Sequence, residues 1–266
     1  MSAKAEIKTV KTENCEMRYC TFGNGKKFFV ILPGLSMKSV LKSANAVSSS
    51  YKAFAENFTA YLFDYGDNVR KSNTPEKLAD DVAASMEALG LCDVYMLGVS
   101  LGGMIAQCIA IKYPHLIKKL VLGSTLSRLN DTMRNTVKTW VELSEKKDGY
   151  ALAEHSVSIM CSDKFRKNFG DFIIQMNKDM TDEDFEKFRN LAKGIYEFDV
   201  YGNLGQIKCP TLVIGAKNDK VLTGQASVEI AEKLGCELYM YDEKYGHIVY
   251  DEASDYKKRV LTFFEK

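Results

Sequence analysis

The segment MLGVSLGGMIAQ, residues 96–107, places a serine between two glycines. Gly98 stands two residues before Ser100 and Gly102 two residues after it, between an apolar run typical of a strand and a run typical of a helix. A sharp strand-to-helix turn of this kind presents a serine as a nucleophile, and its neighbours must be small because the chain passes close to itself. The alternative is that Ser100 caps the helix and that the glycines serve close packing. The strand–turn–helix context favours the nucleophile.

A serine hydroxyl becomes an effective nucleophile when a base takes its proton, and the usual base is a histidine oriented by a carboxylate. The chain has three histidines. We expect structural or surface roles for His115, at the end of the helix after the serine, and for His155, within a long helical stretch. His247 lies in YDEKYGHIVYDE, a loop after the last predicted strand, where the active sites of open α/β sheets collect. We therefore predict that His247 is the base.

The orienting carboxylate is expected between Ser100 and His247 in the chain if the order is serine, acid, histidine. Asp219 follows the strongly apolar run TLVIGA, in a short loop. Its rival is Asp199 in YEFDVYG, where an aspartate that ends a helix or stands in an exposed turn is the simpler interpretation. We favour Asp219 because its predicted strand adjoins the sheet edge that carries the histidine, although a solvated turn aspartate is its structural alternative.

A tetrahedral intermediate needs backbone N–H donors directed at its oxyanion. We expect one donor from Leu101, the residue after the serine. The second is expected from Leu35 in VILPGLSMKS, where Gly34 lets the chain bend after an early strand. A plain Pro33-Gly34 turn without this role is the alternative.

Strand-like and helix-like segments alternate in two parts of the chain. The apolar runs that predict strands cover residues 14–23, 26–34, 58–67, 93–100, 117–125, 209–219 and 236–243. The predicted helices cover residues 74–90, 102–114, 224–235 and 252–266. Thr74 and Pro75 give the first of these helices an N-terminal signal, and Gly90 gives it an end. Short connections between such units predict an α/β fold with a mostly parallel, doubly wound sheet covered by helices on both faces.

Residues 126–206 break this alternation, because they show helical spacing throughout and no convincing strand. Thr181 and Asp184 resemble a capping box at the start of the last of these helices. We therefore predict a core domain formed by residues 1–125 and 207–266, with an inserted helical cap at 126–206.

Composition excludes several classes of function. The net charge of +1 offers no electrostatic basis for binding nucleic acid or an anionic membrane. Seven cysteines are scattered without a CxxC pair, and no histidine has ligand spacing, so we predict neither a disulfide framework nor a metal site. The start MSAKAEIKTV lacks the apolar region of a signal peptide, and no run has the length of a membrane span. We expect a cytoplasmic protein without a cofactor, acting on a small molecule, and its oligomeric state is left open.

These segments resemble, in order, the motifs of the α/β-hydrolase fold superfamily over nearly the whole chain. The similar segments are LPGLS, FDYGDNVRKS, GVSLGG, CPTLVIGAKND and YGHIVYDEASDY. The resemblance implies a catalytic triad of Ser100, Asp219 and His247, with Leu35 and Leu101 as oxyanion donors. Two segments depart from the family pattern: Pro33 stands where many relatives have histidine, and FDYGDNVRKS is an irregular form of Asp-x-Arg-Gly-x-Gly-x-Ser.

Among capped members, lactonases and esterases are the most similar. The resemblance therefore implies a serine hydrolase acting on a small or medium ester, thioester or lactone. A ligand-binding receptor or a lyase that uses the same cavity is the alternative, and a scaffold with a vestigial site is disfavoured. The large apolar residues of the cap are expected mostly in its core, with a minority lining a pocket. These residues are Met133, Trp140, Met160, Phe165, Phe169, Phe172, Met176, Phe185, Phe188, Tyr196 and Phe198.

Overall fold

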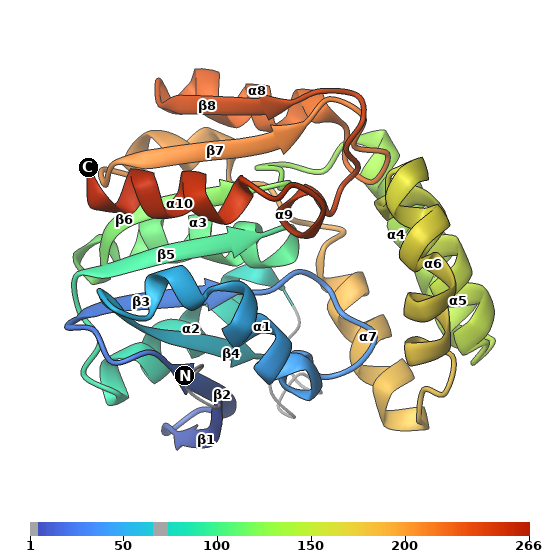
Figure 1. Cartoon of the computed structure of the whole chain (residues 1–266), viewed down its shortest axis with the longest axis horizontal. Coiled ribbons are helices and arrows are strands. Elements are labelled where there is room, and N and C mark those ends of the chain that lie inside the picture. Colours follow the sequence, from blue (N-terminus) through green and yellow to red (C-terminus); the bar gives the residue numbers. More distant parts are fainter. Residues whose placement is uncertain (1–4, 66–73) are drawn as a thin grey trace.

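A twisted eight-stranded sheet forms the centre of the molecule (Figure 1). The computed structural model describes residues 5–65 and 74–266. The strand order is β1-β2-β4-β3-β5-β6-β7-β8; β2 is antiparallel to β1 and β4, and all later pairs are parallel. The strands are β1 (Glu6–Lys11), β2 (Glu16–Phe22), β3 (Lys27–Leu32), β4 (Phe58–Asp64), β5 (Val94–Val99), β6 (Ile117–Gly123), β7 (Thr211–Ala216) and β8 (Glu237–Tyr241). The predicted fold class is confirmed.

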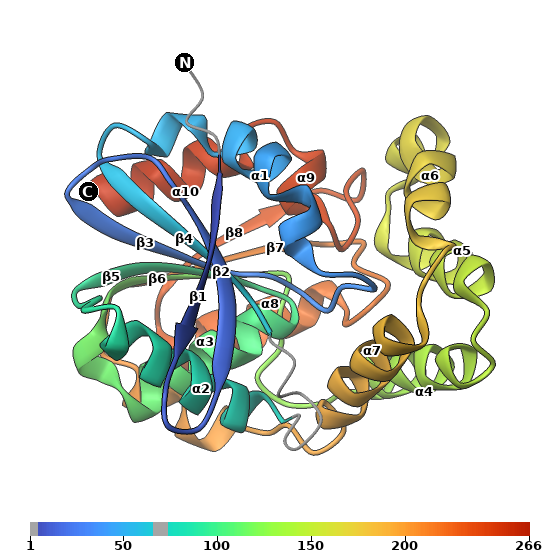
Figure 2. The same cartoon turned by 90° about the horizontal axis from the view of Figure 1, so that it is seen from below.

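Helices cover both faces of the sheet (Figure 2). One face carries α2 (Pro75–Ala88), α3 (Leu101–Lys112) and α8 (Gly224–Leu234), and the other carries α1 (Ala44–Ser50), α9 (Val249–Glu252) and α10 (Tyr256–Glu265). Each face has its own buried apolar cluster. The central strands are mostly apolar because both of their faces are covered, and all six residues of β7 are buried.

Four further helices lie between β6 and β7 in sequence and gather at one end of the sheet (Figures 1 and 2). They are α4 (Asp131–Glu145), α5 (Gly149–Met160), α6 (Asp163–Asn177) and α7 (Asp182–Gly194), and we call them the cap helices. The capping box at α7 is present, because the side chains of Thr181 and Asp184 each accept the other residue's backbone N–H. The division of the chain into two domains at residues 126 and 206 stays a prediction.

The sequence patterns missed some elements. β1 was not predicted, because an edge strand that exposes most of its residues lacks an apolar run. The short helices α1 and α9 were also missed. The strands β2 and β3 follow each other in the chain but are separated in the sheet by β4. Of the motif FDYGDNVRKS, Phe63 to Tyr65 are described, and its remaining residues lie outside the described ranges.

The turn from β5 into α3 is packed so closely that two of its positions need glycine. A β-carbon on Gly98 would lie 2.4 Å from the carbonyl oxygen of Gly102 and 2.8 Å from the Ala106 side chain. A β-carbon on Gly102 would lie 2.1 Å from the carbonyl oxygen of Leu32, at the end of β3. Both glycines therefore allow α3 to start against the ends of β3 and β5, as the spacing around Ser100 predicts.

We expect Gly98→Ala to destabilise the fold by about 2–3 kcal/mol, the usual cost of overpacking a rigid core, because backbone atoms cannot yield as a flexible side chain does. The matched control is Gly202→Ala, where an added β-carbon would meet no atom within 4 Å. Urea unfolding of both variants measures the difference. Equal stability of the two variants would contradict the close packing of the turn.

Candidate active site

Three buried side chains from distant parts of the chain form one hydrogen-bonded row. His247 Nε2 lies 3.1 Å from Ser100 Oγ, and His247 Nδ1 lies 2.8 Å from Asp219 Oδ2. All three residues are buried. Because a carboxylate only accepts, Nδ1 carries the proton and Nε2 is free to accept the serine proton. The structure thus brings together the three residues that the sequence singled out.

Each of the three residues follows the carboxyl end of a parallel strand. Ser100 follows β5, Asp219 lies in the loop after β7, and His247 lies in the loop after β8. Since β7 and β8 are hydrogen-bonded neighbours, their two loops leave the sheet side by side. Open α/β sheets collect their sites at this edge, and the cap helices lie beyond it (Figure 2).

Ser100 has a backbone conformation that residues other than glycine rarely adopt, with φ 52° and ψ −120°. Its N–H donates to the carbonyl oxygen of Gly123 at 2.9 Å, and its own carbonyl oxygen accepts from the Thr125 hydroxyl at 2.8 Å. These bonds to β6 and the residues after it fix the turn on both sides of the serine. Strain of this kind persists only where the surroundings determine it, and such positions cluster at functional sites.

Asp219 is held by its own loop. Its Oδ1 accepts the backbone N–H groups of Val221 at 2.9 Å and Leu222 at 3.1 Å, which leaves Oδ2 for the histidine. The carbonyl groups of the same loop are bound by α4 and its N-cap. Asn130 Nδ2 donates to the Leu222 oxygen at 2.6 Å, and the Thr136 hydroxyl donates to the Val221 oxygen at 3.4 Å. The orientation of the carboxylate is therefore tied to the first cap helix.

The rival residues lie elsewhere. Asp199 is exposed and accepts the N–H of Tyr201, so it has the turn role expected of it. The His115 side chain is 65% exposed and faces Glu87 at 3.4 Å. His155 lies within α5, where burial lowers its pKa.

Buried cysteines are poor alternative nucleophiles, since burial raises the pKa of Cys108 and that of Cys161 to about 12.

The loop after β3, residues 33–39, lies against the serine. A β-carbon on Gly34 would lie 3.2 Å from the β-carbon of Ser100. The buried hydroxyl of Tyr65 donates to the Pro33 oxygen at 2.6 Å, and burial raises the Tyr65 pKa, so this donor keeps its proton. This bond holds the loop at Pro33, the position where many members of the family that the sequence resembles have histidine.

The same loop is also bound to the cap helices. Lys38 Nζ donates to the carbonyl oxygen of Met176 in α6 at 2.8 Å. The Ser39 hydroxyl donates to the buried Asp64 at 2.5 Å, and the other oxygen of Asp64 lies 3.2 Å from Lys187 Nζ in α7. Asp64 thus links the loop that carries Leu35 to the cap.

Two other observations bear on what the molecule binds. In residues 5–65 and 74–266, no group of three or more His, Cys, Asp or Glu side chains could hold a metal ion. No helix of the described ranges is long and apolar enough to cross a membrane.

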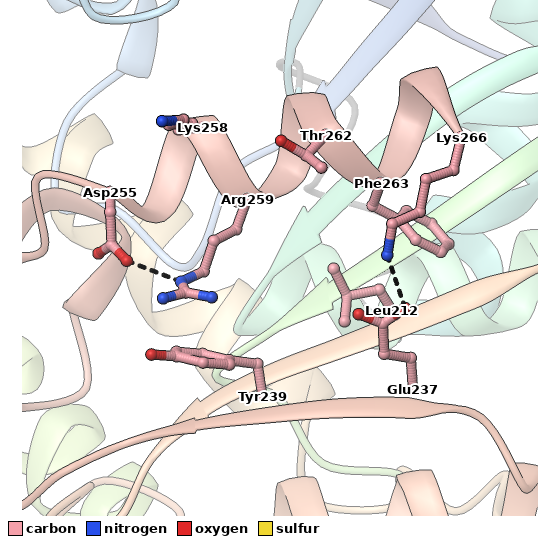
Figure 3. A pocket seen from close by; sticks show the side chains of 9 residues that line it. All are labelled: Leu212, Glu237, Tyr239, Asp255, Lys258, Arg259, Thr262, Phe263 and Lys266. Atoms are coloured by element: carbon pink, nitrogen blue, oxygen red, sulfur yellow. Dashed lines mark hydrogen bonds and ion pairs between the residues drawn. The ribbon is translucent and has the colours of Figure 1, made fainter.

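A separate surface hollow of about 330 Å³ lies between β8 and α10 (Figure 3). Four of its five charged side chains pair with each other: Arg259 with Asp255 at 2.7 Å, and Lys266 with Glu237 at 3.6 Å. Arg259 also stacks on the Tyr239 ring, 3.5 Å from its centroid. This hollow offers paired charges and no triad, so it is the weaker candidate.

Comparison with known proteins identifies the family. The sequence profile described as "alpha/beta hydrolase fold" matches residues 28–254. The chain belongs to the α/β-hydrolase fold family. A relative from Rhizobium rhizogenes whose assigned name is carbamate hydrolase RutD is 26% identical over 239 residues, covering 84% of this chain and 91% of the relative.

Solved α/β-hydrolase structures superpose closely. MGS-M2, an alpha/beta hydrolase enzyme from a Medee basin deep-sea metagenome library, gives a TM-score of 0.86 at 22% identity, covering 97% of this chain and 98% of that one. The enol-lactonase from Burkholderia xenovorans LB400 gives 0.79 at 19% identity, covering 97% and 100%. These likenesses establish the fold.

Sequence reasoning missed the residues that hold this α/β-hydrolase site together. Asp64 lies in the segment FDYGDNVRKS, but the lysine that pairs with it, Lys187, comes from α7, 123 positions later. The same holds for Asn130, which caps α4 and binds the loop of Asp219. Such contacts depend on how the cap helices dock, which no local pattern encodes.

We expect Lys187→Met to lower the free energy of unfolding by about 1–3 kcal/mol, because it leaves the buried Asp64 carboxylate without its cation. The control on the same helix is Lys193→Met, which removes a half-exposed pair with Glu145 and should cost well under about 1 kcal/mol. Urea unfolding compares the two. A loss for Lys187→Met no larger than for the control would refute the importance of this link.

Proposed function

We propose that the protein is a cofactor-independent serine hydrolase that cleaves small or medium, mainly apolar carboxylic esters, thioesters or lactones through an acyl-enzyme on Ser100. The observation that carries the proposal is the row of buried hydrogen bonds from Asp219 through His247 to Ser100. A serine on a strained turn, a histidine with a free ring nitrogen and an orienting carboxylate are the parts that acyl transfer requires.

In the proposed reaction, Ser100 Oγ attacks the carbonyl carbon while His247 Nε2 takes its proton. The histidine then gives this proton to the leaving alcohol, thiol or ring oxygen, and the acyl group stays on the serine. Water attacks the acyl-enzyme with the histidine again as base, which releases the acid and restores the serine. Asp219 keeps the imidazole in the required tautomer and stabilises its charged form.

Leu101 and Leu35 are the proposed oxyanion donors. Leu101 is the first residue of α3, and the first N–H groups of a helix lack acceptors within it. Leu35 is carried by the loop whose Gly34 abuts the serine. Backbone donors need no particular side chain, so Pro33 is compatible with this role.

The substrate class rests on the large apolar residues that the cap helices contribute to the buried cluster around Leu101. Met133, Trp140, Phe185 and Phe188 are buried in the same cluster as Leu101. An apolar lining with few polar groups is typical of small-molecule pockets. The names of the relatives add carbamates and enol-lactones to the compounds worth testing.

Three of the large apolar cap residues lie outside its buried core: Phe169 is 49% exposed, Phe172 66% and Met176 53%.

A fluorophosphonate probe should label the wild-type protein at Ser100. Ser100→Ala should lose hydrolysis of p-nitrophenyl acetate by on the order of 10⁴-fold or more, because it removes the proposed nucleophile. Mass spectrometry of the labelled peptide locates the site. Labelling at another serine, or turnover retained in Ser100→Ala, would disprove the proposal; binding of substrate without turnover would favour the receptor alternative.

The other histidines and the rival aspartate provide matched controls for the same experiment. His247→Ala and Asp219→Ala should nearly abolish turnover, whereas His115→Ala, His155→Ala and Asp199→Ala should retain most of it.

We expect Trp140→Leu to change the preference for acyl-chain length and to leave hydrolysis of the acetate ester largely intact. Trp140 is buried and packs edge-on against the Phe188 ring at 6.1 Å. In the wild type, each methylene that fits should contribute roughly 1 kcal/mol of transition-state binding free energy, measured from kcat/KM. A series of p-nitrophenyl esters from acetate to octanoate measures the profile. Tyr150→Leu, at a half-exposed cap position, is the control; an unchanged profile in Trp140→Leu would count against an acyl site there.

A further inference from the structure

The loop that carries His247 is pressed against the junction between α5 and α6. The backbone N–H of Ile248 donates to the carbonyl oxygen of Met160, the last residue of α5, at 3.2 Å. A β-carbon on Gly246 would lie 2.6 Å from the same oxygen and 2.9 Å from the backbone nitrogen of Ser162. The residues on both sides of the histidine therefore contact the cap directly.

One carboxylate spans this contact. Glu252 Oε1 accepts the backbone N–H of Ser162 at 2.7 Å, and Oε2 accepts the backbone N–H of Gly246 at 3.1 Å. Ser162 is the N-cap residue of α6, and Gly246 directly precedes His247. Each oxygen thus holds one side of the junction, and the carboxyl group is the bridge between them.

The Glu252 carboxyl group is surrounded by hydrogen-bond donors. Hydrogen bonds from N–H groups to a charged acceptor are stronger than those to a neutral one. The N-terminus of α6 also favours negative charge at Ser162, because the peptide dipoles of the helix point their positive end there. The half-buried position of Glu252 reduces screening by water.

We propose that Glu252 is a positioning residue for the proposed reaction: by binding Gly246 and Ser162 together, it keeps His247 Nε2 within hydrogen-bond reach of Ser100 Oγ. The inference rests on the proposed function. The distance between these two atoms is 3.1 Å, so a displacement of the loop by a fraction of an ångström already weakens the bond. Misplacement by about 1 Å can cost on the order of 100-fold in rate.

Three substitutions separate this role from a general structural one. Glu252→Gln keeps the length of the side chain but turns one of its two acceptors into a donor that faces an N–H group. Glu252→Ala removes both acceptors. Asp251→Asn is the matched control, since Asp251 is the neighbouring residue of α9, is exposed, and pairs with Lys257 at 3.3 Å.

For p-nitrophenyl butyrate, we expect kcat to fall about 10-fold in Glu252→Gln and about 30- to 100-fold in Glu252→Ala, with KM within twofold of the wild type. The rate of fluorophosphonate labelling at Ser100 should fall by the same factors, because labelling also needs the base. Asp251→Asn should match the wild type in all three quantities. Circular dichroism and thermal unfolding establish which variants fold. If Glu252→Ala does not fold, Glu252→Gln alone tests the proposal.

The outcomes are distinct for the two proposals. A wild-type protein that hydrolyses no ester and is not labelled at Ser100 disproves the proposed function. If the wild type is labelled there, the Glu252 inference is overturned by wild-type kcat and labelling rate in folded Glu252→Gln. It is also overturned by a rise in KM without a fall in kcat, or by an equal loss in Asp251→Asn.

Discussion

The backbone turn at Ser100 is the constraint on which the site depends. A residue other than glycine at a positive φ, as Ser100 is, costs on the order of 1–3 kcal/mol of stability, so its surroundings must hold the backbone in place. Hydrogen bonds to Gly123 and Thr125 fix the backbone of Ser100 from the end of β6. Gly98 and Gly102, which have no side chain, let α3 begin against the end of β3. This packing fixes where the hydroxyl points. The loops after β7 and β8 then only need to bring an acid and a base to that point.

The cap helices do more than cover the edge of the sheet. α4 and its N-cap Asn130 bind the carbonyl groups of the Asp219 loop, and the α5–α6 junction binds the His247 loop. The loop after β3 is bound directly by α6, and α7 reaches it through Asp64 of β4. Each loop of the site therefore has a hydrogen bond or ion pair to the cap. We infer that the cap supplies no reacting group and yet helps to set the geometry in which the others react.

The sequence predicted what local patterns encode. Apolar runs located the central strands, and the glycines around Ser100 located the turn, because both are consequences of burial and close approach. The order of strands allowed Asp219 and His247 to be chosen from their rivals. The exposed edge strand β1, with almost no apolar run, escaped detection. The links through Asp64 and Glu252 also escaped it, because a carboxylate that binds backbone groups or a distant lysine leaves no periodic signal.

The separation of 147 residues between Ser100 and His247 has a consequence for how the protein is made. Domains form from the N-terminus onward during synthesis, and contacts between distant residues form late because closing long loops is entropically costly. β5, α3 and the cap helices leave the ribosome before β7, β8 and α9, to whose loops the cap is bound. A nascent chain can thus display its serine long before any base can reach it. In the proposed reaction, Ser100 therefore becomes reactive only after the last strands have joined the sheet.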